Sequence, residues 1–244
     1  EVELKDLKDF KIIGTSRKNV DGRKIVTGQP LFGLDYHREG MLIAMLVHPP
    51  AFGLKLKSVD DSAAKAMPGI KEVFTMKVYN DGYEKQWSDT EAFNEKVVVV
   101  GNSTWEVLQA KKALKLEWEP LAAHTDNVQG WGGPQKVNVP GKLESSSAHK
   151  TKMAELNAKP ATLLRKDGNP EVAFKSAAQV IERTYTAPLL AHNTMEPMNF
   201  FAHVTADKAE LVGPIQTPEF MEKSVAARLG LPLEKIDIQM TRQG

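Results

Sequence analysis

The residues whose types and spacing most favour a chemical role lie in the stretch Gly213-Pro214-Ile215-Gln216-Thr217-Pro218. An apolar strand pattern ends there, two prolines fix the loop, and a helix pattern begins at Thr217. A helix N-terminus carries free backbone N–H groups and a partial positive charge, so it favours anionic ligands. The spacing therefore places the Gln216 amide at an anion-binding position, although Gln and Thr before a helix are equally consistent with ordinary capping.

A second polar stretch, residues 191–198, contains the histidine and the carboxylate of most interest, His192 and Glu196. It lies between two strand patterns, and loops in such places often carry function. We expect Glu196 to be a buried anchor for backbone amides rather than a general base, because no partner at suitable spacing is recognisable. A complete small enzyme with Glu196 as base and His192 as acid is the weaker alternative.

The sequence offers no pattern for a metal site or for thiol chemistry. Its six histidines are scattered singly, and the absence of cysteine excludes disulfides, cysteine-ligated clusters and a cysteine nucleophile. Dinucleotide, phosphate-loop, zinc-protease and serine-hydrolase motifs are also absent from the sequence. We therefore expect no metal site and no complete catalytic set in these residues, which leaves a non-enzymatic interaction module open.

Composition places the chain among globular proteins. It has 244 residues, of which 41% are hydrophobic and 26% charged, and a net charge of +1. Such a balance provides no field for nucleic acid or anionic membrane, so we expect neither as a partner. No apolar run approaches the roughly 20 residues of a membrane span, and none is predicted.

The elements that must position these residues form an α+β pattern in two parts. The first part predicts strands over 41–47, 70–74, 96–100 and 114–118 and helices over 63–67 and 104–112. The apolar pattern is lost between 121 and 158, which predicts a linker or irregular excursion. The second part predicts a helix over 171–176, strands over 179–186, 200–204 and 209–212, a helix from 217 to 229 and a final strand reaching 240.

Several short motifs follow one another along most of the chain. They are Phe10-Lys11-Ile12-Ile13-Gly14, Val26-Thr27-Gly28, Phe32-Gly33-Leu34-Asp35, Gly40-Met41-Leu42, Ala66-Met67-Pro68-Gly69-Ile70, the stretch 192–197, and residues from Gln216 to Gly230-Leu231-Pro232. In this order the chain resembles the large, molybdenum-binding subunits of the xanthine dehydrogenase and aldehyde oxidase family, especially its isoquinoline 1-oxidoreductase and aldehyde-oxidising members.

The resemblance implies a domain order and two cofactor-binding residues. Residues 1–21 would form a lead-in, 22–120 an a/b hammerhead domain, 121–158 the linker, and 159–244 the start of a molybdopterin-binding domain. Gln216 matches the family glutamine that hydrogen-bonds an oxo ligand of molybdenum, with Ile215 in place of the usual Thr before it. Gly244 resembles the first glycine of the family's glycine-rich loop, and the catalytic glutamate would lie beyond it.

The resemblance also implies cofactors and partners. The parent protein would use molybdenum on molybdopterin, in its cytosine dinucleotide form, to hydroxylate an aldehyde or N-heterocycle with oxygen from water. A small subunit with [2Fe–2S] clusters would take the electrons, and the cell envelope is the expected location of the parent. The 244 residues alone would be an inactive fragment without cofactor, and unpaired strand edges would favour its self-association.

Overall fold

A computed structural model describes residues 2–79, 83–85, 94–141, 143, 145–188 and 190–244. The chain forms two compact units. The split unit combines Glu1–Glu39 with Ala191–Gly244, and the contiguous unit is Gly40–Leu190.

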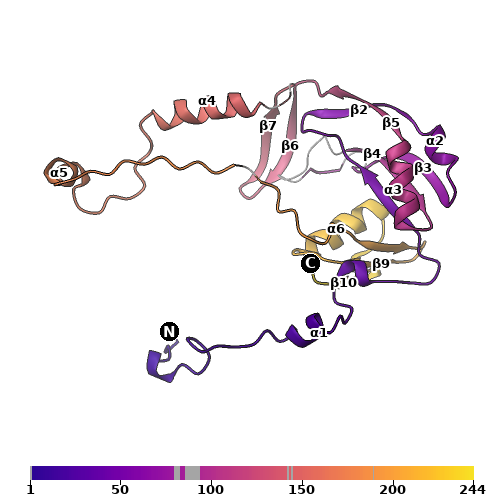
Figure 1. Ribbon diagram of the computed structural model, residues 1–244, viewed down its shortest axis with the longest axis horizontal. Coiled ribbons are helices and arrows are strands. Elements are labelled where there is room, and N and C mark those ends of the chain that lie inside the picture. The colour runs from indigo at the N-terminus through magenta and orange to yellow at the C-terminus, as the bar shows by residue number, and fades with distance from the viewer. Residues whose placement is uncertain (1, 80–82, 86–93, 142, 144, 189) are drawn as a thin grey trace. The chain divides into compact units, whose positions relative to one another are not determined.

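The contiguous unit is built around a three-stranded antiparallel sheet in the order β1-β4-β3 (Figure 1). Its strands are β1 (Ile43–Val47), β3 (Ile70–Lys77) and β4 (Glu95–Gly101). The central strand β4 is a run of valines, and Val97 and Val99 are almost completely buried. β-Branched side chains favour extended backbone and pack well on a pleated surface, so this run fixes the core.

Two short helices pack against this sheet. Helix α3 (Thr104–Ala113) contributes the fully buried Val107 and Ala110 to the core, and α2 (Ser62–Lys65) contributes Ala64. Helix α3 begins where the sequence predicts, because the Ser103 hydroxyl accepts a hydrogen bond from the Glu106 N–H. Strands β2 (Leu54–Asp60) and β5 (Lys115–Pro120) pair beside the same core.

The prediction of irregular chain over 121–158 is wrong in its secondary structure. This stretch contains the hairpin of β6 (His124–Gly130) and β7 (Gly133–Val139), followed by helix α4 (Ser146–Asn157); positions 142 and 144 lie outside the described residues. Hydrophobic periodicity missed the hairpin because the inward side of β6 presents Asp126 beside Val128. Asp126 is held by an ion pair with Lys85 at 2.8 Å, which replaces an apolar contact.

The predicted strand over 179–186 is also not observed. After α5 (Pro170–Ser176), residues 179–186 form no helix and no strand, and Val180, Ile181 and Tyr185 are exposed. The Val, Ile, Thr and Tyr residues of this stretch are typical of strands. A strand also requires a neighbour to accept its hydrogen bonds, and the described residues provide none at this position.

The split unit contains a second sheet in the order β10-β9-β8. Strand β8 (Phe201–Val204) runs antiparallel to β9 (Ala209–Gly213), whereas β10 (Ile236–Met240) runs parallel to it. Helix α6 (Pro218–Leu229) makes the parallel crossover and lies against the sheet, in yellow in Figure 1. It begins with Pro at its first turn and ends at Gly230, whose φ of +68° favours glycine.

The two faces of this sheet are covered differently. Helix α6 buries Ala226 against Ala209, Leu211 and Ile236 on one face. On the other face the N-terminal segment lies over β8, where the Tyr36 and Phe201 ring centroids are 4.7 Å apart. This segment includes η2 (Gly33–Asp35), whereas α1 (Gly22–Val26) and η1 (Leu7–Asp9) bury none of their residues. A last short turn, η4 (Leu233–Lys235), leads into β10.

The predicted α+β class is confirmed, and so are the helices and strands expected around Gln216. The predicted domain boundaries at 22, 121 and 159 stay a prediction, and the compact units divide at other positions. Within the described residues, no helix combines the length and apolar character that crossing a membrane requires.

Candidate functional site

The candidate site lies at the carboxyl edge of the parallel strands β9 and β10. The chain leaves β9 at Gly213 and β10 at Met240, and the Thr241 N–H donates to the Gly213 carbonyl at 3.0 Å. Two loops therefore start side by side, one carrying Gln216 and the other Gly244. This edge of a parallel α/β arrangement is where ligands usually bind.

Gln216 is exposed in the loop between β9 and α6, as the sequence predicts. The side chain of Thr217, at the N-cap position of α6, makes no capping hydrogen bond. The amides of the first turn therefore remain without the side-chain acceptor that a cap supplies. Glu219 is the acidic residue in this turn and offsets part of its positive potential.

Glu196 joins three segments of the split unit through its carboxylate. Oε1 accepts hydrogen bonds from the Leu34 N–H and from Asn199 Nδ2, both at 2.8 Å. Oε2 accepts from the Gly244 N–H at 2.7 Å and from Gln243 Nε2 at 3.4 Å. The side chain is 8% exposed, so the prediction of a buried anchor for backbone amides is confirmed.

The environment of Glu196 keeps it ionised. Burial raises the pKa of Glu196, but the N–H groups of Leu34 and Gly244 and the Asn199 amide together hold it below its ordinary value. The neighbouring Asp35 accepts from the N–H groups of Phe32 and Leu31, which lower its pKa as well. A carboxylate whose two oxygens are already engaged is poorly suited to act as a general base.

His192 does not form an acid–base pair with Glu196. The histidine is exposed, and no hydrogen bond joins the two side chains, both of which belong to the described residues. The weaker alternative of a small enzyme that uses these two residues therefore has no geometric support.

Two buried oxygens near the edge are left without hydrogen bonds. Among the residues that the structure describes, Thr241 Oγ1 and Gln243 Oε1 are buried and have no partner. Gln243 itself is fixed, because its Nε2 donates to the Glu196 carbonyl at 2.7 Å. Buried polar atoms are normally satisfied, so each of these oxygens has the capacity to accept a hydrogen bond from water or from a ligand.

A second polar cluster on the sheet positions the N-terminal segment. Arg38 Nη1 pairs with Glu210 Oε2 at 2.8 Å, and its guanidinium lies 5.4 Å from the Phe201 ring centroid. Hydrogen bonds from Lys208, Arg38 and His203 lower the pKa of Glu210 to about 2. Every cation in this cluster is already engaged, so we assign it to stability.

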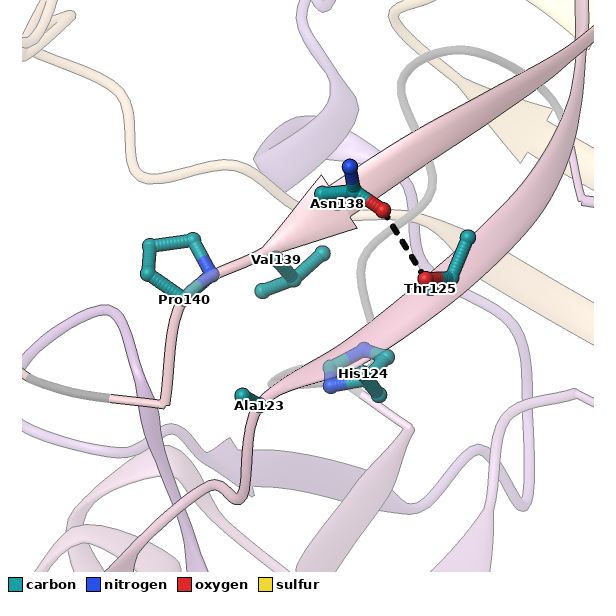
Figure 2. Close-up of a pocket in the computed structure, with 6 residues that line it drawn as sticks. All are labelled: Ala123, His124, Thr125, Asn138, Val139 and Pro140. Carbon is teal, nitrogen blue, oxygen red and sulfur yellow. Dashed lines mark hydrogen bonds between the residues drawn. The ribbon is translucent and has the colours of Figure 1, made fainter.

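The contiguous unit has a shallow hollow of about 410 Å³ on the β6–β7 hairpin (Figure 2). Thr125 and Asn138, which line it, hydrogen-bond each other at 2.9 Å, and His124 Nδ1 contacts the Ala122 carbonyl. His124 Nε2 is buried and makes no hydrogen bond, and it lies 3.4 Å from Asp126 Oδ2. Over the described ranges, no three His, Asp or Glu side chains are grouped closely enough to hold a metal ion.

Sequence reasoning missed several residues of the edge. Asn199, Gln243 and the Leu34 N–H reach Glu196 from different segments, and nothing local in the sequence indicates that they meet. The motif from Phe32 to Asp35 was the available signal, because it singles out the turn that carries the Leu34 amide.

Comparison with known protein families gives a match to the C-terminal part of the chain. Residues 151–244 match the family described as the molybdopterin cofactor-binding domain. This range contains α6, β9 and β10, and with them every residue of the edge described above except those of the N-terminal segment around Leu34.

Curated relatives match across the whole chain. It is 26% identical to isoquinoline 1-oxidoreductase subunit beta of Brevundimonas diminuta, with 100% of the chain and 28% of that protein covered. It is 25% identical to a membrane-bound aldehyde dehydrogenase [pyrroloquinoline-quinone] of Gluconacetobacter polyoxogenes, covering 97% and 27%. The chain thus spans little more than a quarter of the length of these relatives.

Solved structures share the fold. The aldehyde oxidoreductase from Desulfovibrio desulfuricans matches with a TM-score of 0.56 at 16% identity, covering 93% of this chain and 27% of that one. Quinoline 2-oxidoreductase from Pseudomonas putida 86 matches with a TM-score of 0.55 at 18% identity, covering 93% and 30%.

Proposed function

We propose that this chain, which is similar to molybdopterin-binding large subunits of the xanthine dehydrogenase and aldehyde oxidase family, lines one side of a molybdopterin site. The observation that carries the proposal is the carboxyl edge of β9 and β10. The loop that carries Gln216 into α6 and the segment that carries Gln243 and Gly244 leave neighbouring strand ends there, within the matched range.

The residues at this edge fit an anionic cofactor rich in hydrogen-bonding groups. The exposed Gln216 amide offers two donors and one acceptor, and the α6 N-terminus favours a negatively charged group. Thr241 Oγ1 and Gln243 Oε1 are buried acceptors with unused capacity next to this edge, and the threonine hydroxyl is also a donor. The Glu196 carboxylate is ionised, but four N–H donors occupy its oxygens and their dipoles offset part of its repulsion of an anion.

We assign roles within this site residue by residue. Gln216 would orient the cofactor's metal end through its amide, and the Gly244 backbone would lie against the pterin. When bound, the molybdenum centre supplies a two-electron oxidation that adds an oxygen atom from water to the substrate carbon. The chain's own residues bind and orient; the general base that the reaction needs would come from outside these 244 residues.

Further proposals concern the substrate, cofactor form and partner of the whole protein. We propose an aldehyde or N-heterocycle as substrate, the cytosine dinucleotide form of the cofactor, and a small [2Fe–2S] subunit as electron acceptor. The substrates in the names of the relatives, isoquinoline, nicotinate and aldehydes, support this class. We also propose that residues 22–120 form the hammerhead domain and that the 244 residues by themselves are inactive.

The test measures molybdenum and pterin in the complete natural protein that contains this sequence. We expect one molybdenum per chain, and we expect Gln216→Ala to lower turnover at least tenfold. The control Gln29→Ala changes an exposed glutamine of the same unit and should keep both cofactor and turnover. Wild-type protein without molybdenum would overturn the proposal and would favour an interaction module instead.

A further inference from the structure

We infer that Glu196 is a positioning residue of the cofactor edge, whose carboxylate locks the Gln243–Gly244 turn and the Leu34 turn into one fixed arrangement. Glu196 acts through these backbone segments and not by touching the cofactor. The consequence for the cofactor rests on the proposed function, whereas the hydrogen-bond arrangement stands without it.

Each oxygen of the Glu196 carboxylate accepts hydrogen bonds from a different pair of donors. Oε1 binds Leu34, 162 residues earlier in the chain, together with Asn199. Oε2 binds the Gly244 N–H and Gln243 Nε2, 48 and 47 residues later. An ionised carboxylate can accept hydrogen bonds from all of these donors. Charged acceptors also form stronger hydrogen bonds than neutral ones.

Backbone contacts make the three segments one body. The Glu196 N–H donates to the Gly244 carbonyl at 3.4 Å, and the Arg242 N–H donates to the Leu31 carbonyl at 2.9 Å. Phe32 and Arg242 form a parallel bridge beside the same point. The turn after β10 is therefore held from both sides, with the carboxylate at the centre.

The four hydrogen bonds at position 196 require a carboxylate and not an amide. Glutamine at 196 would keep one acceptor oxygen and would turn an NH2 group towards two donors. It could satisfy the Leu34 and Asn199 pair or the Gly244 and Gln243 pair, but not both. The substitution thus preserves size while releasing one of the two turns.

The experiment compares Glu196→Gln with wild type in the complete natural protein, by hydrogen exchange at the amides of Leu34 and Gly244 and by molybdenum content. We expect exchange at one of these amides to rise at least tenfold, and molybdenum content to fall severalfold. The matched control is Glu210→Gln, which removes an engaged carboxylate of the same unit away from the edge. It should lower the melting temperature while keeping wild-type molybdenum and wild-type exchange at both amides.

Several outcomes would overturn the inference. Wild-type exchange at both amides in Glu196→Gln would do so, and so would an equal loss of molybdenum in Glu210→Gln, which would indicate general destabilisation. If Glu196→Gln fails to fold, Asn199→Ala removes one Oε1 partner, and it should speed exchange at Leu34 while leaving Gly244 unchanged. Wild-type protein without molybdenum refutes the cofactor role, and the exchange pattern still decides the positioning of the turns.

Discussion

The carboxylate of Glu196 accepts the N–H of Leu34 at 2.8 Å, although 162 residues separate the two in sequence. This hydrogen bond fixes the N-terminal segment to the loop before β8, and the second oxygen of the same side chain fixes the turn after β10. One side chain thereby connects the beginning and the end of the split unit at the proposed cofactor edge.

The close approach of Gly33 to Asn199 gives a first prediction. A Cβ at Gly33 would overlap the Asn199 amide, which donates to Glu196 Oε1. We expect Gly33→Ala to destabilise the protein by about 1–3 kcal/mol, because the Asn199 side chain must move. Chemical denaturation measures the change. Gly22→Ala, where the new methyl group would meet only ordinary contact, should leave stability within about 0.5 kcal/mol, and equal losses in both variants would refute the argument.

The charge cluster around Glu210 predicts a pH dependence. Its folded-state pKa of about 2 lies below the ordinary 4.5, so the unfolded state binds more protons between these values. The stabilisation is present above pH 4.5 and is lost as the pH falls towards 2. Denaturation midpoints across this range should fall less steeply in Glu210→Gln than in wild type. The same slope in both proteins would contradict the prediction, and exposed Glu234→Gln is the control.

The valine run of β4 predicts a cavity effect. Val99 is fully buried in the contiguous unit, so Val99→Ala removes two methyl groups from a packed core. We expect a loss of about 2 kcal/mol in the free energy of unfolding. Val20→Ala changes a valine that is 91% exposed and should cost almost nothing. A cost below about 0.5 kcal/mol at Val99 would show that the core collapses around the gap.

The cap of α3 predicts a smaller effect. The Ser103 hydroxyl accepts the Glu106 N–H and donates to the Glu106 carboxylate at 2.8 Å. Ser103→Ala should cost about 1 kcal/mol, and Ser103→Asp, which keeps the acceptor for the helix N–H, should recover part of it. Thermal unfolding checks both variants, and an Ala variant as stable as wild type would mean that water replaces the cap.

Sequence patterns predicted elements that carry their own local signals. The valines of β4, the Ser103 cap and the Pro218-to-Gly230 limits of α6 are each readable over a few residues. The β6–β7 hairpin was not predicted, because its buried position Asp126 depends on Lys85, a residue 41 positions away. The predicted strand at 179–186 failed for the opposite reason, since its composition favours an extended chain but the partner strand is missing from the described residues.

In the candidate site, too, the features with local sequence signals were predicted and those that depend on distant residues were not. The position of Gln216 before α6 is local and was predicted, as was the anchoring role of Glu196. The donors that Glu196 binds could not be predicted, because tertiary folding alone brings Leu34, Asn199 and Gly244 together. The roles of Gln216 and Gly244 towards the cofactor stay predictions.

The division of the chain into a contiguous and a split unit determines an order of events during synthesis on the ribosome. All residues of the contiguous unit emerge before β8 is made, so its valine core can form while translation continues. The N-terminal turn at Leu34 must wait for Glu196, and the edge closes only after Gly244 has left the exit tunnel. Among these residues the edge of β9 and β10 is therefore completed late, so a site that uses it cannot form before Gly244 has been made.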